Sequence, residues 1–171
     1  MNARRVSVDI ASRLWWLPLT ATGLLRDRGS RGRWLCVPGL VALTAVISTT
    51  GKLTIRRPRP SVGYGSPPIG RLGLASSFPS THAACTFAIA GWMWRSHRRT
   101  WLHLLAVTVG YSRVRSRAHH LSDVLAGGAL GYAIGRCVDW IWWVLMGAVG
   151  DRATQKDPFG TATGRWRSTL E

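Results

Sequence analysis

Residues 112–123 read SRVRSRAHHLSD, and an apolar run from position 124 to position 146 follows them at once. The apolar run is long enough to form a helix that crosses a bilayer. The polar stretch before it brings arginines, two imidazoles and one carboxylate together within a short segment. We therefore expect half of a catalytic site here, and we expect other parts of the chain to supply the second half and a membrane scaffold.

Apolar residues make up 46% of the 171-residue chain, and they are unevenly distributed. They gather into blocks at residues 35–50, 83–94, 101–111 and 124–146, and short Arg-rich or Pro/Gly-rich connections separate the blocks. This layout is typical of a polytopic membrane protein. We predict an all-α fold: a polytopic transmembrane helical bundle with four core spanning helices and a short N-terminal helix.

The sequence predicts three regions along the chain. Residues 1–30 contain a short apolar segment at 14–25, which as a helix reaches about 18 Å and is therefore either interfacial or a short span. Residues 31–149 form the membrane-embedded core. Residues 150–171 are polar, and we expect them to form a disordered cytoplasmic tail.

The formal net charge of +16 raises the question of nucleic acid binding. The cations lie between apolar blocks, so they fit a membrane surface and a phosphorylated substrate better than a nucleic acid. Basic clusters at residues 26–33 and 95–99 are typical of cytoplasmic loops. The opposite, non-cytoplasmic face then carries the loops around Lys52, Pro79 and residues 112–123. We expect a multi-pass protein of the cell membrane with its active site on that face.

Two further patterns concern packing. Gly127, Gly131 and Gly135 are spaced four apart, which puts them on one helix face where another backbone can approach closely. We expect this face to pack within the bundle rather than to form a dimer seam. Tryptophans near the expected cytoplasmic helix ends, among them Trp34 and Trp92, are typical of an aromatic belt at the membrane interface.

Polar residues on the non-cytoplasmic face share an ability to bind or to react with a phosphate group. They are Lys52, Arg59, Ser80, His82, Arg113, His119 and Asp123. Fixed cations and the backbone donors at a helix start stabilise the negative charge of a phosphate in its transition state. Other arginines are more typical of lipid headgroup anchors: Arg56, Arg57, Arg71, Arg115 and Arg117.

His119 and Asp123 are four apart, so on a helix the carboxylate can accept from one imidazole nitrogen and leave the other to attack phosphorus. By composition alone the neighbouring His120 is an alternative nucleophile. An imidazole with a pKa of about 6.5 changes charge near working pH, which suits His82 to protonate the leaving oxygen. Asp123 is the one acidic residue from position 28 to position 138, so we expect neither a catalytic metal nor another cofactor.

Three motifs resemble those of the type 2 phosphatidic acid phosphatase superfamily. Lys52 to Pro60 reads K-x6-R-P, Pro79 to His82 reads P-S-T-H where the family has P-S-G-H, and Ser112 to Asp123 reads S-R-x5-H-x3-D. Their order and relative placement match, and the similarity covers roughly residues 35–137. The resemblance implies a metal-independent helical core shared with vanadium haloperoxidases, and it implies dephosphorylation of lipid phosphates through a phosphohistidine.

The resemblance also implies a role for each matching residue. Phosphate-binding roles would fall to Lys52, Arg59, Arg113, the Ser80 side chain and the Thr81 backbone N–H. Catalytic roles would fall to His82 as general acid, His119 as nucleophile and Asp123 as its orienting partner. The family has glycine where this chain has Thr81, and a left-handed backbone at that position would be strained by a β-branched residue.

The sequence therefore predicts an integral-membrane phosphatase that acts on a phosphomonoester or diphosphate of a membrane lipid. A polyprenyl phosphate or diphosphate is slightly favoured as substrate, because small members of the resembled family often act there. Phosphatidic acid or phosphatidylglycerophosphate is the alternative within this class. From other classes, the alternatives are a non-catalytic membrane protein that binds lipid phosphate and a vanadium haloperoxidase, although haloperoxidases are normally soluble and lack such apolar blocks.

Overall fold

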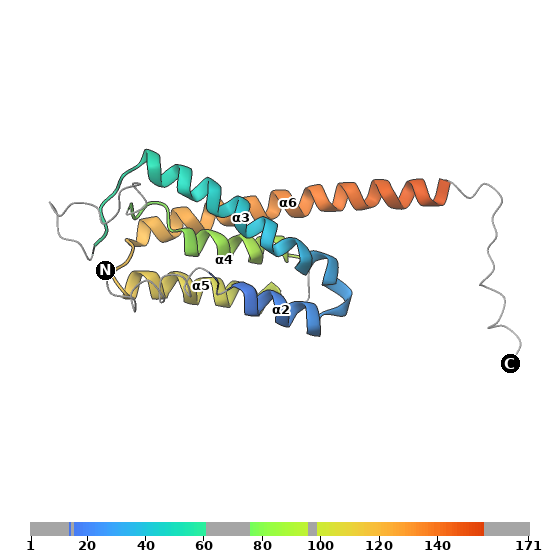
Figure 1. Cartoon of the computed structure of the whole chain (residues 1–171), viewed down its shortest axis with the longest axis horizontal. Coiled ribbons are helices and arrows are strands. Elements are labelled where there is room, and N and C mark those ends of the chain that lie inside the picture. The colour runs from blue at the N-terminus through green and yellow to red at the C-terminus, as the bar shows by residue number, and fades with distance from the viewer. Residues whose placement is uncertain (1–13, 15, 61–75, 96–98, 156–171) are drawn as a thin grey trace, which may run out of the picture. The chain divides into compact units, whose positions relative to one another are not determined.

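The computed structural model describes residues 14, 16–60, 76–95 and 99–155 (Figure 1). Its helices are α2 (Trp16–Arg26), α3 (Arg31–Thr54), α4 (Thr81–Trp92), α5 (Arg99–Arg115) and α6 (Leu121–Gln155), with a short 3-10 helix η1 (Arg28–Ser30) before α3. Within these residues there is no strand. The predicted all-α class is confirmed.

The chain divides into two compact units, Met1–Asp139 and Trp140–Glu171. All residues predicted for the site belong to the first unit. In the second unit the described residues are the last part of α6, which continues past Gly150 to Gln155. The first residues of the predicted tail are therefore helical, and residues 156–171 lie outside the described part of the chain.

Helix α4 is the central helix of the first unit. It packs against α3 and α5, and Figure 1 shows it between α5 on one side and α3 with the first part of α6 on the other. Nine of its twelve residues are buried, on every side of the helix. A helix that is apolar all round belongs in the interior of a bundle, and α4 therefore forms the core that holds the site-bearing loops in place.

Glycines let α6 approach α4 backbone to backbone. A Cβ on Gly131 would clash with the Ala84 carbonyl, and one on Gly135 would clash with the Ala88 carbonyl. A side chain at either position would force the two helices apart, so the sequence is restricted to glycine there. The prediction that the glycine face packs within the bundle is confirmed.

Trp34 and Trp92 are buried side chains that join α3 to its neighbours. The Trp34 indole N–H donates to Asp27 Oδ2 at 3.2 Å, and the Trp92 indole N–H donates to the Arg33 carbonyl at 2.9 Å. Both tryptophans are fully buried. The predicted aromatic belt is therefore wrong for these two residues, because each indole has a hydrogen-bond acceptor inside the protein instead of at a membrane surface.

A buried carboxylate gathers three arginines at the α4 end that is remote from the predicted site. Asp139 lies 2.7 Å from Arg33, 3.1 Å from Arg95 and 3.1 Å from Arg136. Its side chain is almost completely buried, so its negative charge is removed from water and requires the positive charges of the arginines. The network fastens the start of α3 and the segment after α4 to α6.

One described stretch is long and apolar enough to cross a membrane: the 27 residues Arg28–Thr54, which contain an 18-residue window with a mean hydropathy of 1.6. The 12 residues of α4 are fewer than the roughly 20 that a perpendicular span requires. The short N-terminal helix is present as the 11 residues of α2. The four spanning helices stay a prediction.

Replacing Gly131 by Ala tests the contact between α4 and α6. The new Cβ would meet the Ala84 backbone, and we expect the free energy of unfolding to fall by about 1–3 kcal/mol because the helices must separate. Thermal unfolding of the protein in detergent measures the change. Gly39→Ala is the matched control, since a Cβ there meets nothing within 4 Å; equal melting temperatures for the two variants would refute the close packing.

Candidate active site

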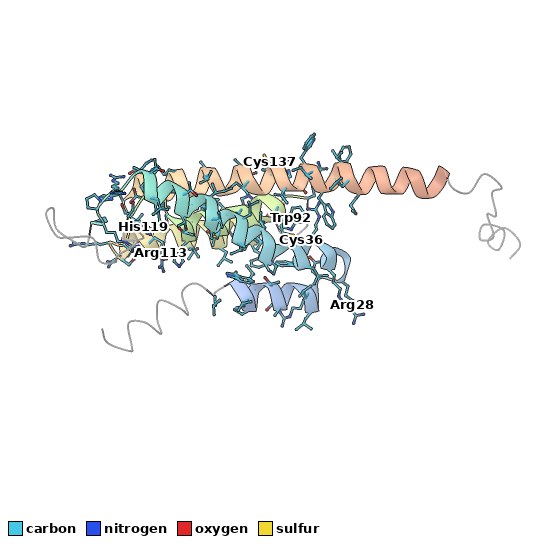
Figure 2. All side chains as sticks on the ribbon, turned by 45° about the horizontal axis from the view of Figure 1, so that its top comes forward. Arg28, Cys36, Trp92, Arg113, His119 and Cys137 are labelled. Atoms are coloured by element: carbon cyan, nitrogen blue, oxygen red, sulfur yellow. The ribbon has the colours of Figure 1, made fainter. Side chains whose placement is uncertain are left out.

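The candidate site lies where α3 ends and where α4 and α6 begin. The Ser80 N–H donates to the Asp123 carbonyl at 3.0 Å, which ties the start of α4 to the first turn of α6. A Cβ on Gly51 would lie 3.0 Å from Pro79 Cδ, so the last turns of α3 pass close to the same point. Figure 2 shows His119 at this end of the unit and Trp92 toward the other.

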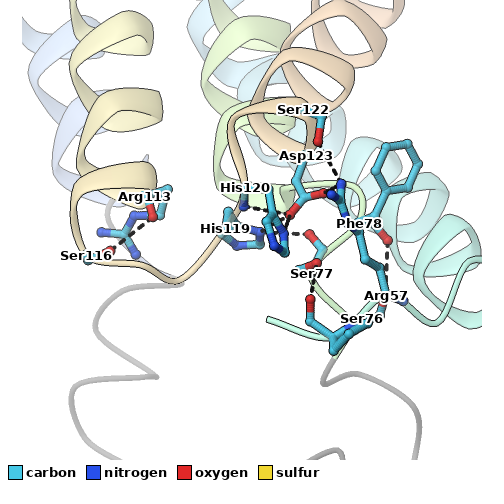
Figure 3. A network of polar contacts seen from close by, with 11 residues as sticks. Arg57, Ser76, Ser77, Phe78, Arg113, Ser116, His119, His120, Ser122 and Asp123 are labelled. Atoms are coloured by element: carbon cyan, nitrogen blue, oxygen red, sulfur yellow. Dashed lines mark hydrogen bonds and ion pairs between the residues drawn. The ribbon is translucent and has the colours of Figure 1, made fainter. Parts of the chain in front are cut away.

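His119 is buried at the centre of a polar network (Figure 3). Its Nδ1 lies 2.7 Å from the main-chain carbonyl oxygen of Ser77. A carbonyl oxygen can only accept, so Nδ1 carries the proton and donates it. In the neutral ring the lone pair then resides on Nε2, and this is the tautomer that an attacking imidazole requires.

His119 lies in the loop between α5 and α6, where it is buried and close to positive charges. The pKa of His119 is lowered from 6.5 to about 4, chiefly by burial, and the positive charges of Arg59 and Lys52 contribute in the same direction. The hydrogen bond to Ser77 and the charge of Asp123 act in the opposite direction but do not outweigh them. At neutral pH His119 is therefore uncharged, as a nucleophile must be.

Asp123 is completely buried in the first turn of α6 and has several partners. Its Oδ1 lies 2.7 Å from Arg57 Nη1, and its Oδ2 accepts from the His120 backbone N–H at 2.8 Å. The ring Nδ1 of His120 is 3.2 Å from the same Oδ2, whereas Nδ1 of His119 is 3.9 Å away. The predicted direct hydrogen bond between Asp123 and His119 is therefore not formed, because Ser77 occupies the imidazole donor.

The predicted phosphate-binding cations reach the site to different extents. Lys52 is buried on the last turn of α3, and its charge and that of Arg59 act on His119. Arg113, at the end of α5, is connected to His119 by its main-chain carbonyl, which accepts from the His119 N–H at 3.3 Å. The Arg113 guanidinium contacts the Ser112 hydroxyl at 3.3 Å, and Figure 3 draws it to one side of the His119 network.

The start of α4 supplies the remaining predicted residues. Ser80 is the N-cap of the helix, and its hydroxyl makes no capping hydrogen bond. The Ser80 Oγ is buried with no hydrogen-bond partner among the described residues, a condition that is rare unless a ligand or water satisfies the group. Thr81 and His82 follow in the first turn, half-buried. The helix begins two residues after Pro79, where the sequence favours its start.

Thr81 is accommodated without a left-handed backbone. Among the described residues other than glycine, Arg117 alone has a positive φ, of 54°. The strain that the sequence raised for a β-branched residue at position 81 is therefore absent, and the Thr81 N–H points from the first turn of a helix as the predicted phosphate contact requires.

The sequence pattern missed two residues of this network, Arg57 and Ser77. The interpretation of Arg57 as a lipid headgroup anchor is wrong, since its Nη1 binds both Asp123 and, at 2.7 Å, Ser122 Oγ. Nothing in the run of arginines and prolines from position 56 to position 60 distinguishes it from its neighbours. Ser77 acts through a main-chain carbonyl, for which a sequence carries no side-chain signal.

The described residues contain no cluster of three or more His, Cys, Asp or Glu side chains suited to hold a metal ion. Asp123 is joined to the His120 imidazole and to Arg57 rather than to further carboxylates. The donor set therefore fits an anion such as phosphate better than a divalent cation.

Comparison with known proteins gives a family and several relatives. The PAP2 superfamily matches residues 33–147. The decaprenylphosphoryl-5-phosphoribose phosphatase of Mycobacterium tuberculosis is 31% identical over 129 residues, which cover 72% of this chain and 70% of that protein. The lipid A 1-phosphatase of Porphyromonas gingivalis is 33% identical over 147 residues, 78% of this chain but 30% of its own length. No solved structure matches the chain.

The low pKa of His119 predicts how stability depends on pH. The unfolded chain binds a proton at His119 below about pH 6.5, whereas the folded protein does so only near pH 4. The contribution of His119 to the free energy of unfolding is therefore complete above pH 6.5. It falls by about 3 kcal/mol in all as the pH decreases toward 4. Melting temperatures of the wild type and of His119→Gln, measured from pH 7 to pH 4 in detergent, should diverge, with the wild type losing more. Parallel curves would contradict the prediction.

Proposed function

The chain belongs to the PAP2 superfamily and is a phosphoric ester hydrolase; from the geometry of its site we propose an integral-membrane, metal-independent lipid phosphate phosphatase that works through a phosphohistidine. The observation that carries this proposal is the state of His119. A buried imidazole that donates from Nδ1, has its lone pair on Nε2 and stays neutral beside cations is suited to attack phosphorus.

The proposed phosphate cradle surrounds this imidazole. Lys52 and Arg59 balance the charge on the phosphoryl oxygens, together with Arg113 once its side chain turns from Ser112 toward the substrate. The buried hydroxyl of Ser80 has no partner among the described residues and would donate to one oxygen. The N–H of Thr81 would donate to another from the positive end of the α4 dipole.

The reaction proceeds in two displacements. Nε2 of His119 attacks phosphorus, the N–P bond forms, and the bond to the leaving oxygen breaks while protonated His82 supplies the proton that this oxygen needs. His82 then removes a proton from water, the water oxygen attacks the phosphohistidine, and the N–P bond breaks to release phosphate. His119 and His82 both return to their starting states, so the two displacements balance with water as the second reactant.

A membrane location is supported by the distribution of polarity in the first unit. Large apolar side chains are exposed on the outer faces of three helices: Leu35 and Val46 on α3, Leu104 and Val107 on α5, and Leu121 and Leu125 on α6. Charged and polar side chains such as Lys52, Asp123 and Asp139 are buried. This arrangement suits a lipid solvent. We propose that the helices cross the cell membrane several times and that the site faces the non-cytoplasmic side.

The proposed substrate is a phosphate or diphosphate on a polyprenyl lipid. The relative from Mycobacterium tuberculosis is named for a decaprenyl-linked phosphoribose, and that from Porphyromonas gingivalis for lipid A. The proposal of a polyprenyl substrate is thus supported by a relative that aligns with this protein over most of its length. Phosphatidic acid and phosphatidylglycerophosphate are the comparison substrates.

Phosphate release by the purified protein tests the reaction. In detergent with excess chelator, the wild type should release phosphate from a polyprenyl phosphate or diphosphate faster than from phosphatidic acid. His119→Ala should lower kcat by at least about a thousandfold, because the N–P bond of the proposed reaction forms at its Nε2. His103→Ala, remote from the site at the far end of α5, is the control. Chelator-sensitive release, an active His119 variant, or tight binding without turnover would each overturn the proposal.

The leaving group separates the role of His82 from that of His119. p-Nitrophenolate leaves without a proton, so His82→Ala should lose about 100-fold or more in kcat on an alkyl phosphate and much less on p-nitrophenyl phosphate. His119→Ala should lose activity on both. Steady-state kinetics with the two substrates measures the difference, and equal losses for His82→Ala on both would remove His82 from the role of general acid.

A further inference from the structure

The acceptor that orients the proposed nucleophile is a main-chain oxygen rather than a carboxylate. Nδ1 of His119 has one proton in the neutral ring, and it lies 2.7 Å from the Ser77 carbonyl and 3.9 Å from Asp123 Oδ2. The shorter distance is a hydrogen bond and the longer one is not. The carboxylate therefore acts on His119 only through its charge and through other residues.

Arg57 holds this carboxylate. Its Nη1 lies 2.7 Å from Asp123 Oδ1 and 2.7 Å from Ser122 Oγ, so one guanidinium nitrogen fixes the first turn of α6 (Figure 3). The other carboxylate oxygen accepts from the His120 backbone N–H. Asp123 is fully buried, and a buried carboxylate without its cation would be strongly destabilised.

The main chain of Arg57 also holds the Ser77 segment. The Arg57 carbonyl accepts from the Ser77 N–H at 2.8 Å, and the Arg57 N–H donates to Ser76 Oγ at 3.1 Å. The Ser77 hydroxyl donates to the next carbonyl, that of Pro58, at 3.1 Å. The peptide whose oxygen binds His119 is thus fastened to the loop that carries Arg57.

We infer that Arg57 is a positioning residue for the proposed phosphatase reaction, joining the Ser77 carbonyl that orients His119 to the Asp123 carboxylate at the start of α6. Asp123 acts through Arg57 and the His120 backbone instead of serving as the hydrogen-bond partner of the nucleophile. The inference rests on the proposed function, because it assigns a role in that reaction.

A double-mutant cycle between Arg57 and Asp123 tests the inference. Arg57→Gln and Asp123→Asn should each lower kcat about 10- to 100-fold with KM changed less than threefold, because the phosphate contacts remain. The double variant should be within about threefold of the worse single variant, since both changes break one connection. Arg57→Lys should recover part of the loss. Arg56→Gln, at the exposed neighbouring arginine, is the matched control and should stay within about twofold of the wild type.

The choice of substrate distinguishes an effect on the attack of the nucleophile from an effect on protonation of the leaving group. The Arg57→Gln loss should be equal on an alkyl phosphate and on p-nitrophenyl phosphate, because attack and not protonation is impaired. If Asp123 instead orients His119 directly, Asp123→Asn should lose on the order of 10⁴ in kcat, as when an orienting carboxylate is removed from a catalytic triad, and far more than Arg57→Gln.

Three results would overturn the inference. The first is a far larger loss of kcat in Asp123→Asn than in Arg57→Gln. The others are additive losses in the double variant and an Arg57→Gln activity equal to that of Arg56→Gln. Melting temperatures identify a variant that fails to fold, and Arg57→Lys then carries the test. A failure of the proposed function itself looks different: the wild type releases no phosphate, or His119→Ala remains active.

Discussion

The close approach of α4 and α6 is the constraint on which the site depends. Backbone meets backbone along the glycine face of α6, and a Cβ on Gly127 would lie 2.5 Å from the Ser80 carbonyl. That contact leaves the Ser80 N–H within 3.0 Å of the Asp123 carbonyl. A helix start with free donors and the loop that carries His119 therefore meet because the residues between them have no side chains to hold them apart.

Two buried carboxylates of the first unit, Asp123 and Asp139, have cations around them. Asp123 is compensated by Arg57 at the site, and Asp139 by three arginines near the other end of α4. The positive charges of Arg59 and Lys52 act on His119 and, together with its burial, lower its pKa. Positive charge beside His119 suits the proposed binding of a phosphate dianion.

Sequence patterns predicted the helices well, because apolar blocks record burial directly; the roles of the site residues stay a prediction. The polar stretch of residues 112–123 was placed correctly before a long helix. The partners of Asp123 could not be predicted, since the i, i+4 spacing from His119 indicates proximity and does not say which acceptor takes the proton. Trp34 was misassigned because Asp27, its acceptor, becomes a neighbour only after α2 and α3 pack together.

The Ser77 carbonyl that binds His119 has an evolutionary consequence. A main-chain oxygen is present whatever amino acid occupies position 77, so no single substitution there deletes the acceptor, whereas an orienting carboxylate can be lost by one codon change. The tautomer of the proposed nucleophile is therefore set by the backbone conformation at position 77 and not by the side chain there. Comparisons that align side chains will not register this acceptor, and selection to preserve it will fall on the residues that shape the loop.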